Sequence, residues 1–250
     1  MSKKKSPKVP KTPKTPKTPP APAVQPVAEP PSSLHDLSHW TLTIPGQSTI
    51  IRAADLVAGY TNPKYFYLLS DAAMAFRATT AGFTTANSNY PRSELREQLL
   101  PPSNSANWEL AGRHVLDATC RVAQLSAAKK VIIGQVHAYQ GNAYPLVKLF
   151  HRNGNIELDV KRGPLDNTDD KSKICAMKLG TWFNYQIIIE GTELMVRVDD
   201  HVLSQKLNPD WDSNSFYFKA GAYCIDASGD PKDAAEVHFS HLSVSHGPSL

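Results

Sequence analysis

The sequence predicts an all-β fold of the sandwich or jelly-roll type, built from many short strands. Apolar and polar residues alternate with a period of two in most segments between residues 40 and 245. Turn signals such as Asn153-Gly154 and Gly229-Asp230-Pro231 interrupt these segments at short intervals. Hardly any stretch has the 3.6-residue period of an amphipathic helix, so packed sheets must form the core.

The first half of the folded part is expected to contain five strands and one helical turn. Pro45-Gly46 ends the first strand, and Thr, Asn and Ser residues over 82–89 predict a loop before the strand that carries Arg92. A second loop is predicted at 101–105. The expected strands are 40–44, 65–69, 73–77, the segment around Arg92, and 113–123, with the helical turn at 53–58.

The second half is expected to continue as hairpins. Asn153-Gly154 predicts a tight turn between two strands, and Gly191-Thr192 predicts another. Polar residues predict a loop at 163–173 and a connecting turn at 209–214. The expected strands are 131–139, 146–151, 156–161, 182–190, 194–198, 217–223 and 236–245.

Residues 1–34 have a different composition and are predicted to be a disordered arm, with the folded domain at 35–250. The arm contains seven Lys, ten of the 20 Pro, one acid (Glu29) and a repeated Lys-Thr-Pro triplet. It has almost no large apolar side chains, so it cannot bury enough surface to fold. We expect an extended Lys/Pro-rich tether.

The arm also accounts for the positive net charge of +4. Its seven Lys and one Glu give +6, and the remaining 20 basic and 22 acidic residues give −2. The folded domain has no basic helix and no recognised nucleic-acid motif, so we expect it to bind no nucleic acid. No apolar run is long enough to span a membrane. The N-terminus lacks the hydrophobic segment of a secretory signal, which predicts either another export route or action where the protein is made.

The three cysteines, Cys120, Cys175 and Cys224, fit neither a zinc site nor a complete disulfide framework, because they are widely spaced and odd in number. We expect Cys224 to be a buried packing residue. His238 and His241 are three apart and would point to opposite faces of a strand, so no metal site is expected there.

Three predicted strands each carry one polar face. In residues 90–97, alternation places Arg92, Glu94 and Arg96 on one side and Ser93 and Leu95 on the other. The same parity groups Gln135, His137 and Tyr139 in a second strand, and Tyr217, Lys219, Gly221 and Tyr223 in a third. If the three strands share one sheet, the combined face suits a sugar acid, since guanidinium groups bind carboxylates with paired hydrogen bonds.

These three blocks resemble the signature blocks of the alginate lyases of polysaccharide lyase family 7, in the same order. The blocks are Arg92-Ser93-Glu94-Leu95-Arg96, Gln135-Val136-His137, and Tyr217-Phe218-Lys219-Ala220-Gly221-Ala222-Tyr223. Residues 40–45 and 145–149 are also similar, so the resemblance spans most of 36–246. It implies a concanavalin-like jelly roll with an open concave cleft. Ile225 stands where the third block usually has Gln, and Val136 is a weak indication of a mannuronate-rich substrate.

The resemblance implies an endo-acting lyase that cleaves 1,4-linked uronates by β-elimination. The chemistry requires the carboxylate to be neutralised before the C5 proton leaves, and Arg92 and Gln135 are the expected donors. His137 and Tyr223 are the expected proton carriers, provided that nearby cations lower the pKa of the phenol. By analogy with the family, Tyr223 is the acid and also the base for mannuronate, and His137 is the base for guluronate. No metal or organic cofactor is required.

The remaining members of the expected site bind substrate. They are Glu94, Arg96, Lys148, Lys219 and Tyr217, with Glu94 orienting Arg92 or Arg96. The expected partner is an anionic polysaccharide, alginate, bound by a monomer. The alternative is a non-catalytic module that holds an acidic glycan on the same fold. A glycoside hydrolase is disfavoured, because such enzymes commonly carry their two catalytic carboxylates in an E-x-D-x-x-E run, and here Glu157-Leu158-Asp159 is followed by Arg162 in place of the last Glu.

Overall fold

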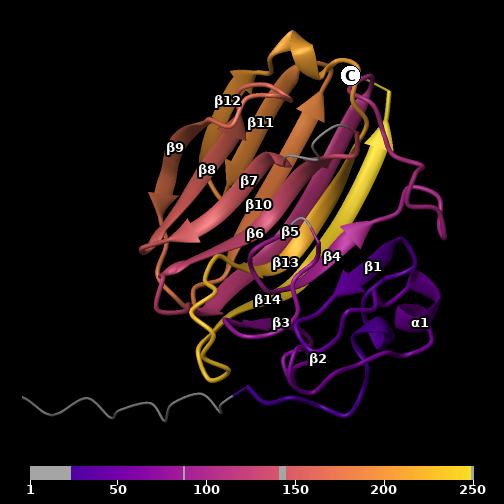
Figure 1. Cartoon of the computed structure of the whole chain (residues 1–250), viewed down its shortest axis with the longest axis vertical. Coiled ribbons are helices and arrows are strands. Elements are labelled where there is room, and N and C mark those ends of the chain that lie inside the picture. Colours follow the sequence, from indigo (N-terminus) through magenta and orange to yellow (C-terminus); the bar gives the residue numbers. More distant parts are fainter. Residues whose placement is uncertain (1–23, 87, 141–144, 249–250) are drawn as a thin grey trace, which may run out of the picture.

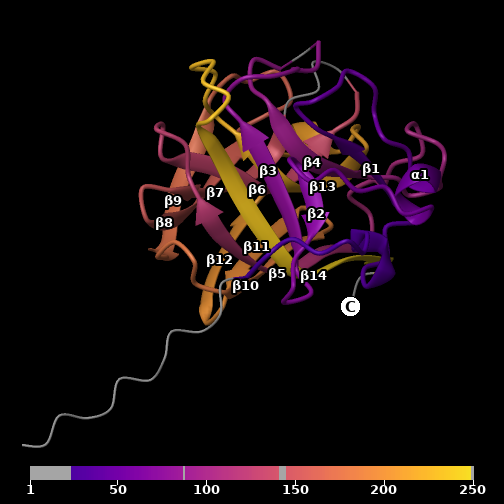
Figure 2. The same ribbon diagram turned by 90° about the horizontal axis from the view of Figure 1, so that it is seen from below.

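The computed structural model describes residues 24–86, 88–140 and 145–248, and within them the chain forms two seven-stranded antiparallel sheets. The sheets pack face to face as a β-sandwich, which confirms the all-β prediction (Figures 1 and 2). Phe76 and Phe239 of one sheet lie edge to face between the layers, with ring centroids 5.4 Å apart. The Tyr185 hydroxyl crosses the core and donates to the carbonyl of Ile133 in the other sheet, 3.1 Å away.

One layer carries the predicted polar faces, and we call it the cleft sheet. Its strand order is β1-β4-β13-β6-β7-β8-β9. The bounds are β1 Trp40–Thr43, β4 Arg92–Glu97, β13 Phe216–Cys224, β6 Lys130–Ala138, β7 Pro145–Arg152, β8 Asn155–Lys161 and β9 Asp169–Ala176.

The other layer, the back sheet, covers the apolar side of the cleft sheet. Its order is β12-β11-β10-β5-β14-β3-β2. The bounds are β12 His201–Lys206, β11 Glu193–Val198, β10 Phe183–Glu190, β5 Arg113–Gln124, β14 Ala234–Gly247, β3 Met74–Thr79 and β2 Phe66–Leu68. The chain also forms α1 at Ala53–Val57 and short 3₁₀ helices at Pro31–Ser33 and Pro209–Trp211. The predicted helical turn is α1, which packs against β1 (Figure 1).

Two strands differ from the prediction. β9 occupies the second half of the predicted loop at 163–173, and β12 was not predicted at all. Both are edge strands with polar side chains on both faces, as in Asp169-Asp170-Lys171-Ser172-Lys173. Charged edge strands resist unwanted pairing, but they lose the apolar alternation that marks a strand in the sequence.

Residues 24–34 fall in the predicted arm, yet they pack on the domain. The Val27 amide donates to the carbonyl of Leu68 at 2.9 Å, Pro26 forms a bridge with Leu69, and Pro31 is buried. The folded part therefore starts before residue 35. The prediction of a disordered arm at residues 1–23 lies outside the described residues.

Candidate active site

The register of the cleft sheet brings the three polar faces together. β13 lies between β4 and β6, and Tyr223 is opposite Arg92 while Lys219 is opposite both Arg96 and Gln135. Tyr217 is opposite His137. The alternation predicted from the sequence is present, because the intervening Phe218, Ala220 and Ala222 are buried in the core. A single surface therefore contains all three predicted blocks.

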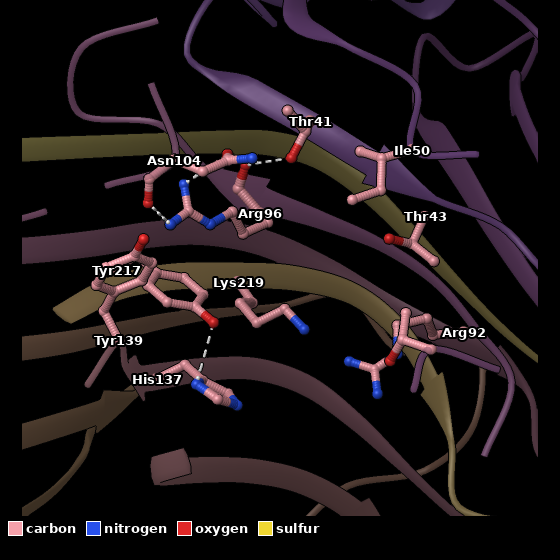
Figure 3. A pocket seen from close by; sticks show the side chains of 11 residues that line it. Thr41, Thr43, Ile50, Arg92, Arg96, Asn104, His137, Tyr139, Tyr217 and Lys219 are labelled. Atoms are coloured by element: carbon pink, nitrogen blue, oxygen red, sulfur yellow. Dashed lines mark hydrogen bonds between the residues drawn. The ribbon is translucent and has the colours of Figure 1, made fainter. Parts of the chain in front are cut away.

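A cavity of about 300 Å³ opens on this surface. In Figure 3, Arg96 and Asn104 lie toward one end, Arg92 toward the other, and Lys219 between them, with His137 alongside. The lining comprises Thr41, Thr43, Ile50, Thr85, Arg92, Arg96, Asn104, His137, Tyr139, Tyr217 and Lys219. Five predicted site residues, Arg92, Arg96, His137, Tyr217 and Lys219, thus share one cavity.

Glu94 and Gln135 lie beneath the floor of this cavity and are almost fully buried. The Glu94 carboxylate accepts a hydrogen bond from Arg92 at 3.0 Å, pairs with Lys219 Nζ at 2.5 Å and accepts from the Gln135 amide. Burial opposes the charged carboxylate, but Lys219 and Arg92 outweigh it and hold the pKa of Glu94 below its usual value. An ionised Glu94 therefore orients three of the predicted site residues from below.

Arg92 is held on its other side by Ser88 and Tyr223. Its Nη2 donates to Ser88 Oγ at 2.7 Å, and its guanidinium carbon lies 3.8 Å from the centroid of the Tyr223 ring. The Tyr223 hydroxyl is 2.8 Å from the same Ser88 oxygen. Tyr223 thus contacts Arg92 directly, at the margin of the cavity.

The ionisation of Tyr223 differs from the expectation. The sequence-based hypothesis required nearby cations to lower the pKa of the phenol. Burial is the larger effect and raises the pKa of Tyr223, although Arg92 acts in the opposite direction. Tyr223 is therefore a protonated phenol in the free protein, a state suited to donate a proton.

His137 has one nitrogen engaged and one available. Its Nδ1 is 2.8 Å from the carbonyl of Ala138 and 3.1 Å from the Tyr217 hydroxyl. A carbonyl only accepts, so Nδ1 carries the proton and Nε2 keeps its lone pair. Burial, followed by the charge of Lys219, lowers the pKa of His137 to about 3. The imidazole is therefore neutral at ordinary pH and can accept a proton at Nε2.

Sequence reasoning missed several residues around Arg96. Its guanidinium donates to the Asn104 carbonyl at 2.6 Å and to Asn107 Oδ1 at 2.9 Å, and it lies 4.1 Å from the centroid of the Tyr217 ring. The asparagines come from a loop without regular periodicity, so no pattern marked them. Thr41 and Thr43 could have been found, because they alternate with buried Trp40 and Leu42 on β1.

Lys148, like Glu94, Gln135 and Tyr223, is not among the residues that line the cavity, and its ion-pair partner lies outside the predicted site. It is opposite Gln135 on β7, so it faces the same side of the sheet. Its Nζ forms an ion pair with Asp169 at 2.6 Å, and Lys161 Nζ lies 3.1 Å from the same carboxylate. A substrate carboxylate would have to compete with Asp169 for Lys148.

Within the described ranges, no cluster of three or more His, Cys, Asp or Glu side chains could hold a metal ion. None of the helices in that part of the chain is long and apolar enough to cross a membrane. The three cysteines are buried and unpaired, and Cys224 packs in the core as predicted.

Known proteins resemble this chain over most of its length. The family model described as alginate lyase matches residues 35–246. Alginate lyase A1-II', a member of polysaccharide lyase family 7, is 35% identical, with 87% of this chain and 99% of that chain aligned and a TM-score of 0.82. Variants of A1-II' have been crystallised with substrate and with product.

Two further relatives extend the comparison. An alginate lyase of Pseudomonas aeruginosa is 34% identical over 85% of this chain and all of that chain, with a TM-score of 0.78. An alginate lyase of Klebsiella pneumoniae is 27% identical over 87% of this chain and 91% of its own length. Because the family model covers most of the chain and relatives above 30% identity span nearly all of their own length, the chain belongs to the alginate lyases of polysaccharide lyase family 7.

Proposed function

We propose that this chain is a lyase that cleaves the 1,4-linked uronate polymer alginate by β-elimination in the cavity of the cleft sheet. The observation that carries the proposal is the convergence of Arg92 and His137 in one cavity above buried Gln135, with Tyr223 against Arg92. Binding alone would need the cations but neither a neutral imidazole nor a protonated phenol. The arrangement therefore favours catalysis over the alternative of a non-catalytic glycan-binding module.

The first requirement of the reaction is to neutralise the uronate carboxylate. The C5 hydrogen lies beside an ionised carboxylate, and its removal places further negative charge on the carboxylate oxygens. Arg92 can donate to those oxygens, and the Gln135 amide has a second N–H beyond the one given to Glu94. Because Glu94 and Ser88 already orient these donors, they need little rearrangement as charge develops.

The second requirement is a proton acceptor for C5 and a proton donor for O4. His137 Nε2 has a lone pair, which suits the base for guluronate, where the proton and the leaving oxygen lie on opposite sides. Tyr223 is protonated, which suits the acid that completes cleavage of the C4–O4 bond. For mannuronate, Tyr223 takes both roles: it first releases its own proton to solvent, and the phenolate then takes the C5 proton and passes it to the leaving O4. The product carries a C4–C5 double bond at its new non-reducing end.

We also propose the mode of cleavage, the preferred uronate and the oligomeric state. The cavity floor is part of a continuous sheet face that extends through β7 to β9, so a long polymer can cross it, and we propose endo action. By analogy with the family, the buried Val136 beside His137 favours a mannuronate-rich substrate. We propose a monomer, since the described residues contribute every side chain that the reaction needs.

The test is to mix the protein with alginate and follow the ultraviolet absorbance of the new double bond. We expect activity in the wild type and a loss of roughly 10²–10⁴-fold in kcat for His137→Asn on guluronate blocks and for Tyr223→Phe on both blocks. Arg92→Ala should lose about 10²–10³-fold in kcat, because it removes a donor to the developing charge.

Matched controls separate chemistry from folding. His241→Asn removes an exposed imidazole of β14, and Tyr90→Phe removes a hydroxyl from the ring that meets Tyr223 at 6.3 Å. Both should retain activity within a few-fold. Binding of alginate by the folded wild type without any rise in absorbance would show a glycan-binding module instead.

A further inference from the structure

A second polar cluster lies on the opposite side of β4 from the cavity, between the two sheets. It contains Glu97 at the end of β4, His114 of β5, His246 of β14 and Trp108 from the preceding loop, and we call it the Glu97 network. Glu97 is only 1% exposed. A buried carboxylate of this kind requires compensating donors, so each of its contacts is informative.

The contacts of the Glu97 network form one continuous chain. Glu97 Oε2 accepts from the Trp108 indole at 3.1 Å and from the Phe218 amide at 2.8 Å. Glu97 Oε1 is 2.6 Å from His246 Nε2, and His246 Nδ1 is 2.8 Å from His114 Nδ1. His114 Nε2 is 3.0 Å from the carbonyl of Ala111. The chain thus runs from the cleft sheet into the back sheet.

The Glu97 network needs one more proton than its two histidines carry when both are neutral. Three contacts each need one hydrogen: carboxylate to His246, His246 to His114, and His114 to the Ala111 carbonyl. Two neutral imidazoles carry one hydrogen each, and an ionised carboxylate carries none. An imidazolium at His246, paired with an ionised Glu97, supplies the third hydrogen. The side chain of His246 is 20% exposed, so this proton can exchange with solvent.

The network meets the backbone directly behind the cavity. Glu97 follows Arg96 on β4, and the Arg96 guanidinium donates to the Glu97 carbonyl at 2.6 Å. The Phe218 amide that binds the carboxylate lies between Tyr217 and Lys219 on β13. β4 and β13, which both carry cavity residues, are therefore connected to β14 and β5 through the pair formed by Glu97 and His246.

Few other charges face this cluster. Arg96 approaches from β4, and only the backbone of Glu109, in the loop before β5, interacts with His114. Arg113 of β5 lies next to His114 in sequence but pairs with Glu190 of β10 at 3.5 Å. Burial is the main effect on His114 and lowers its pKa, which favours a neutral His114.

We propose that Glu97 and His246 are positioning residues, and that they hold the Arg96 and Tyr217 end of the cleft in place only while the Glu97 network retains its third proton. The effect of the Glu97 network on substrate binding rests on the proposed function, whereas the number of protons in the network does not. Loss of the proton leaves a buried negative charge with one contact lacking a hydrogen. One of the hydrogen bonds that join the two sheets behind the cavity is then lost.

The proton count fixes how stability depends on pH. Above the ordinary histidine pKa of about 6.5, the unfolded chain holds two protons on these three groups and the folded network holds three. Folding then takes up a proton, so the unfolding equilibrium constant rises up to tenfold per pH unit until the folded network releases its proton. Below about 6.5 the unfolded chain holds four protons, and acidification favours unfolding instead.

Glu97→Gln gives a sharp test, because a neutral amide satisfies the same contacts with one proton fewer. The Gln oxygen can accept from Trp108 and Phe218, and its NH₂ group can donate to His246 Nε2. His246 and His114 are then both neutral. The ratio of the wild-type to the Glu97→Gln unfolding constant, from urea titrations, should rise about tenfold per pH unit above about pH 5. Glu193→Gln, on an exposed position of β11, should give a ratio that does not change with pH.

A second measurement uses the substrate. KM for alginate should rise at alkaline pH in the wild type relative to Glu97→Gln, with kcat changing less. Both proteins keep every cavity residue, so their other titrations cancel in this ratio. If the ratio of the two unfolding constants does not depend on pH, the network does not hold a third proton, whether or not the protein is a lyase. If that ratio changes with pH as expected but the ratio of the two KM values stays constant, Glu97 and His246 are not positioning residues. If Glu97→Gln does not fold, nitrogen NMR of the wild-type histidines decides: a neutral His246 near pH 7 overturns the proposal.

Discussion

At the scale of single residues, burial decides the protonation states of the cleft. His137, Lys219 and Tyr223 all have pKa values shifted toward the neutral form, and burial is the largest cause for each. Glu94 keeps its charge against burial, because two cations adjoin it. The cleft therefore has a neutral base, a neutral acid and one cation, Lys219, whose charge depends on the pH near neutrality.

Lys219 gives a prediction at this scale. Burial, then the charge of Arg92, lowers its pKa to about 8 despite the ion pair with Glu94. Lys219 is cationic below this pH and neutral above it, so its attraction for substrate carboxylates should fade as pH rises through about 8. We expect KM for alginate to increase above pH 8 in the wild type.

Lys219→Arg is the informative variant, since a guanidinium keeps its charge at any pH in this range. Its KM should increase less between pH 7 and pH 9 than that of the wild type, as measured by initial rates. An identical increase in both proteins would mean that another group controls binding.

At the scale of elements, β13 is the strand on which the site depends, and Gly221 shapes it. Gly221 has a φ of +145°, and the register with β6 shifts between Ala220 and Tyr223. A Cβ at this position would lie 2.5 Å from the Ser93 carbonyl oxygen and 2.8 Å from the Glu94 Cα. Only glycine allows β13 to approach β4 so closely opposite Glu94, two residues before Tyr223 pairs with Arg92.

Gly221→Ala should therefore lower the free energy of unfolding by roughly 2–4 kcal/mol, combining backbone strain with a clash against main-chain atoms. Gly154→Ala is the control, because Gly154 also has positive φ, at +79°, but has open space around its Cβ position. It should lose only about 1 kcal/mol. Urea titration of both variants measures the difference, and equal losses would show that the close approach has no steric cost.

The sequence predicted the elements that alternate and missed those that do not. Val136 and Phe218 are buried beside His137 and Lys219, so parity alone identified the cleft face. The edge strand at Asp169 was read as a loop because its charges mask its conformation. Contacts across strands, such as Ser88 with Tyr223, depend on loop paths that no local pattern encodes. The same limit concealed the Glu97 network, whose members lie up to 149 positions apart.

At the scale of the whole molecule, the charges are divided between two parts of the chain. Seven Lys lie in residues 1–34, while residues 35–250 have a net charge of −2 from 20 basic and 22 acidic residues. A negatively charged domain that acts on a polyanion must rely on a local cluster of cations. The cavity supplies this cluster through Arg92, Arg96 and Lys219.

Removal of residues 1–23 tests this division. That segment has few apolar side chains, so we expect the truncated chain to keep the Tm of the full chain within about 2 °C, since a 1 kcal/mol change would shift a domain of this size by roughly 2–4 °C. Differential scanning calorimetry measures the change. A large drop in Tm would place part of the stability in residues 1–23 and contradict the predicted domain division.

The carboxylate of Glu94 has a consequence for turnover. It cancels one of the positive charges above it, so the cleft attracts a polyanion less strongly than three unopposed cations would. A cleft that bound every substrate carboxylate with three unopposed cations would also bind the shortened products tightly. Because Glu94 weakens the positive potential of the cleft, we expect the shortened fragments to dissociate faster than they would from three unopposed cations.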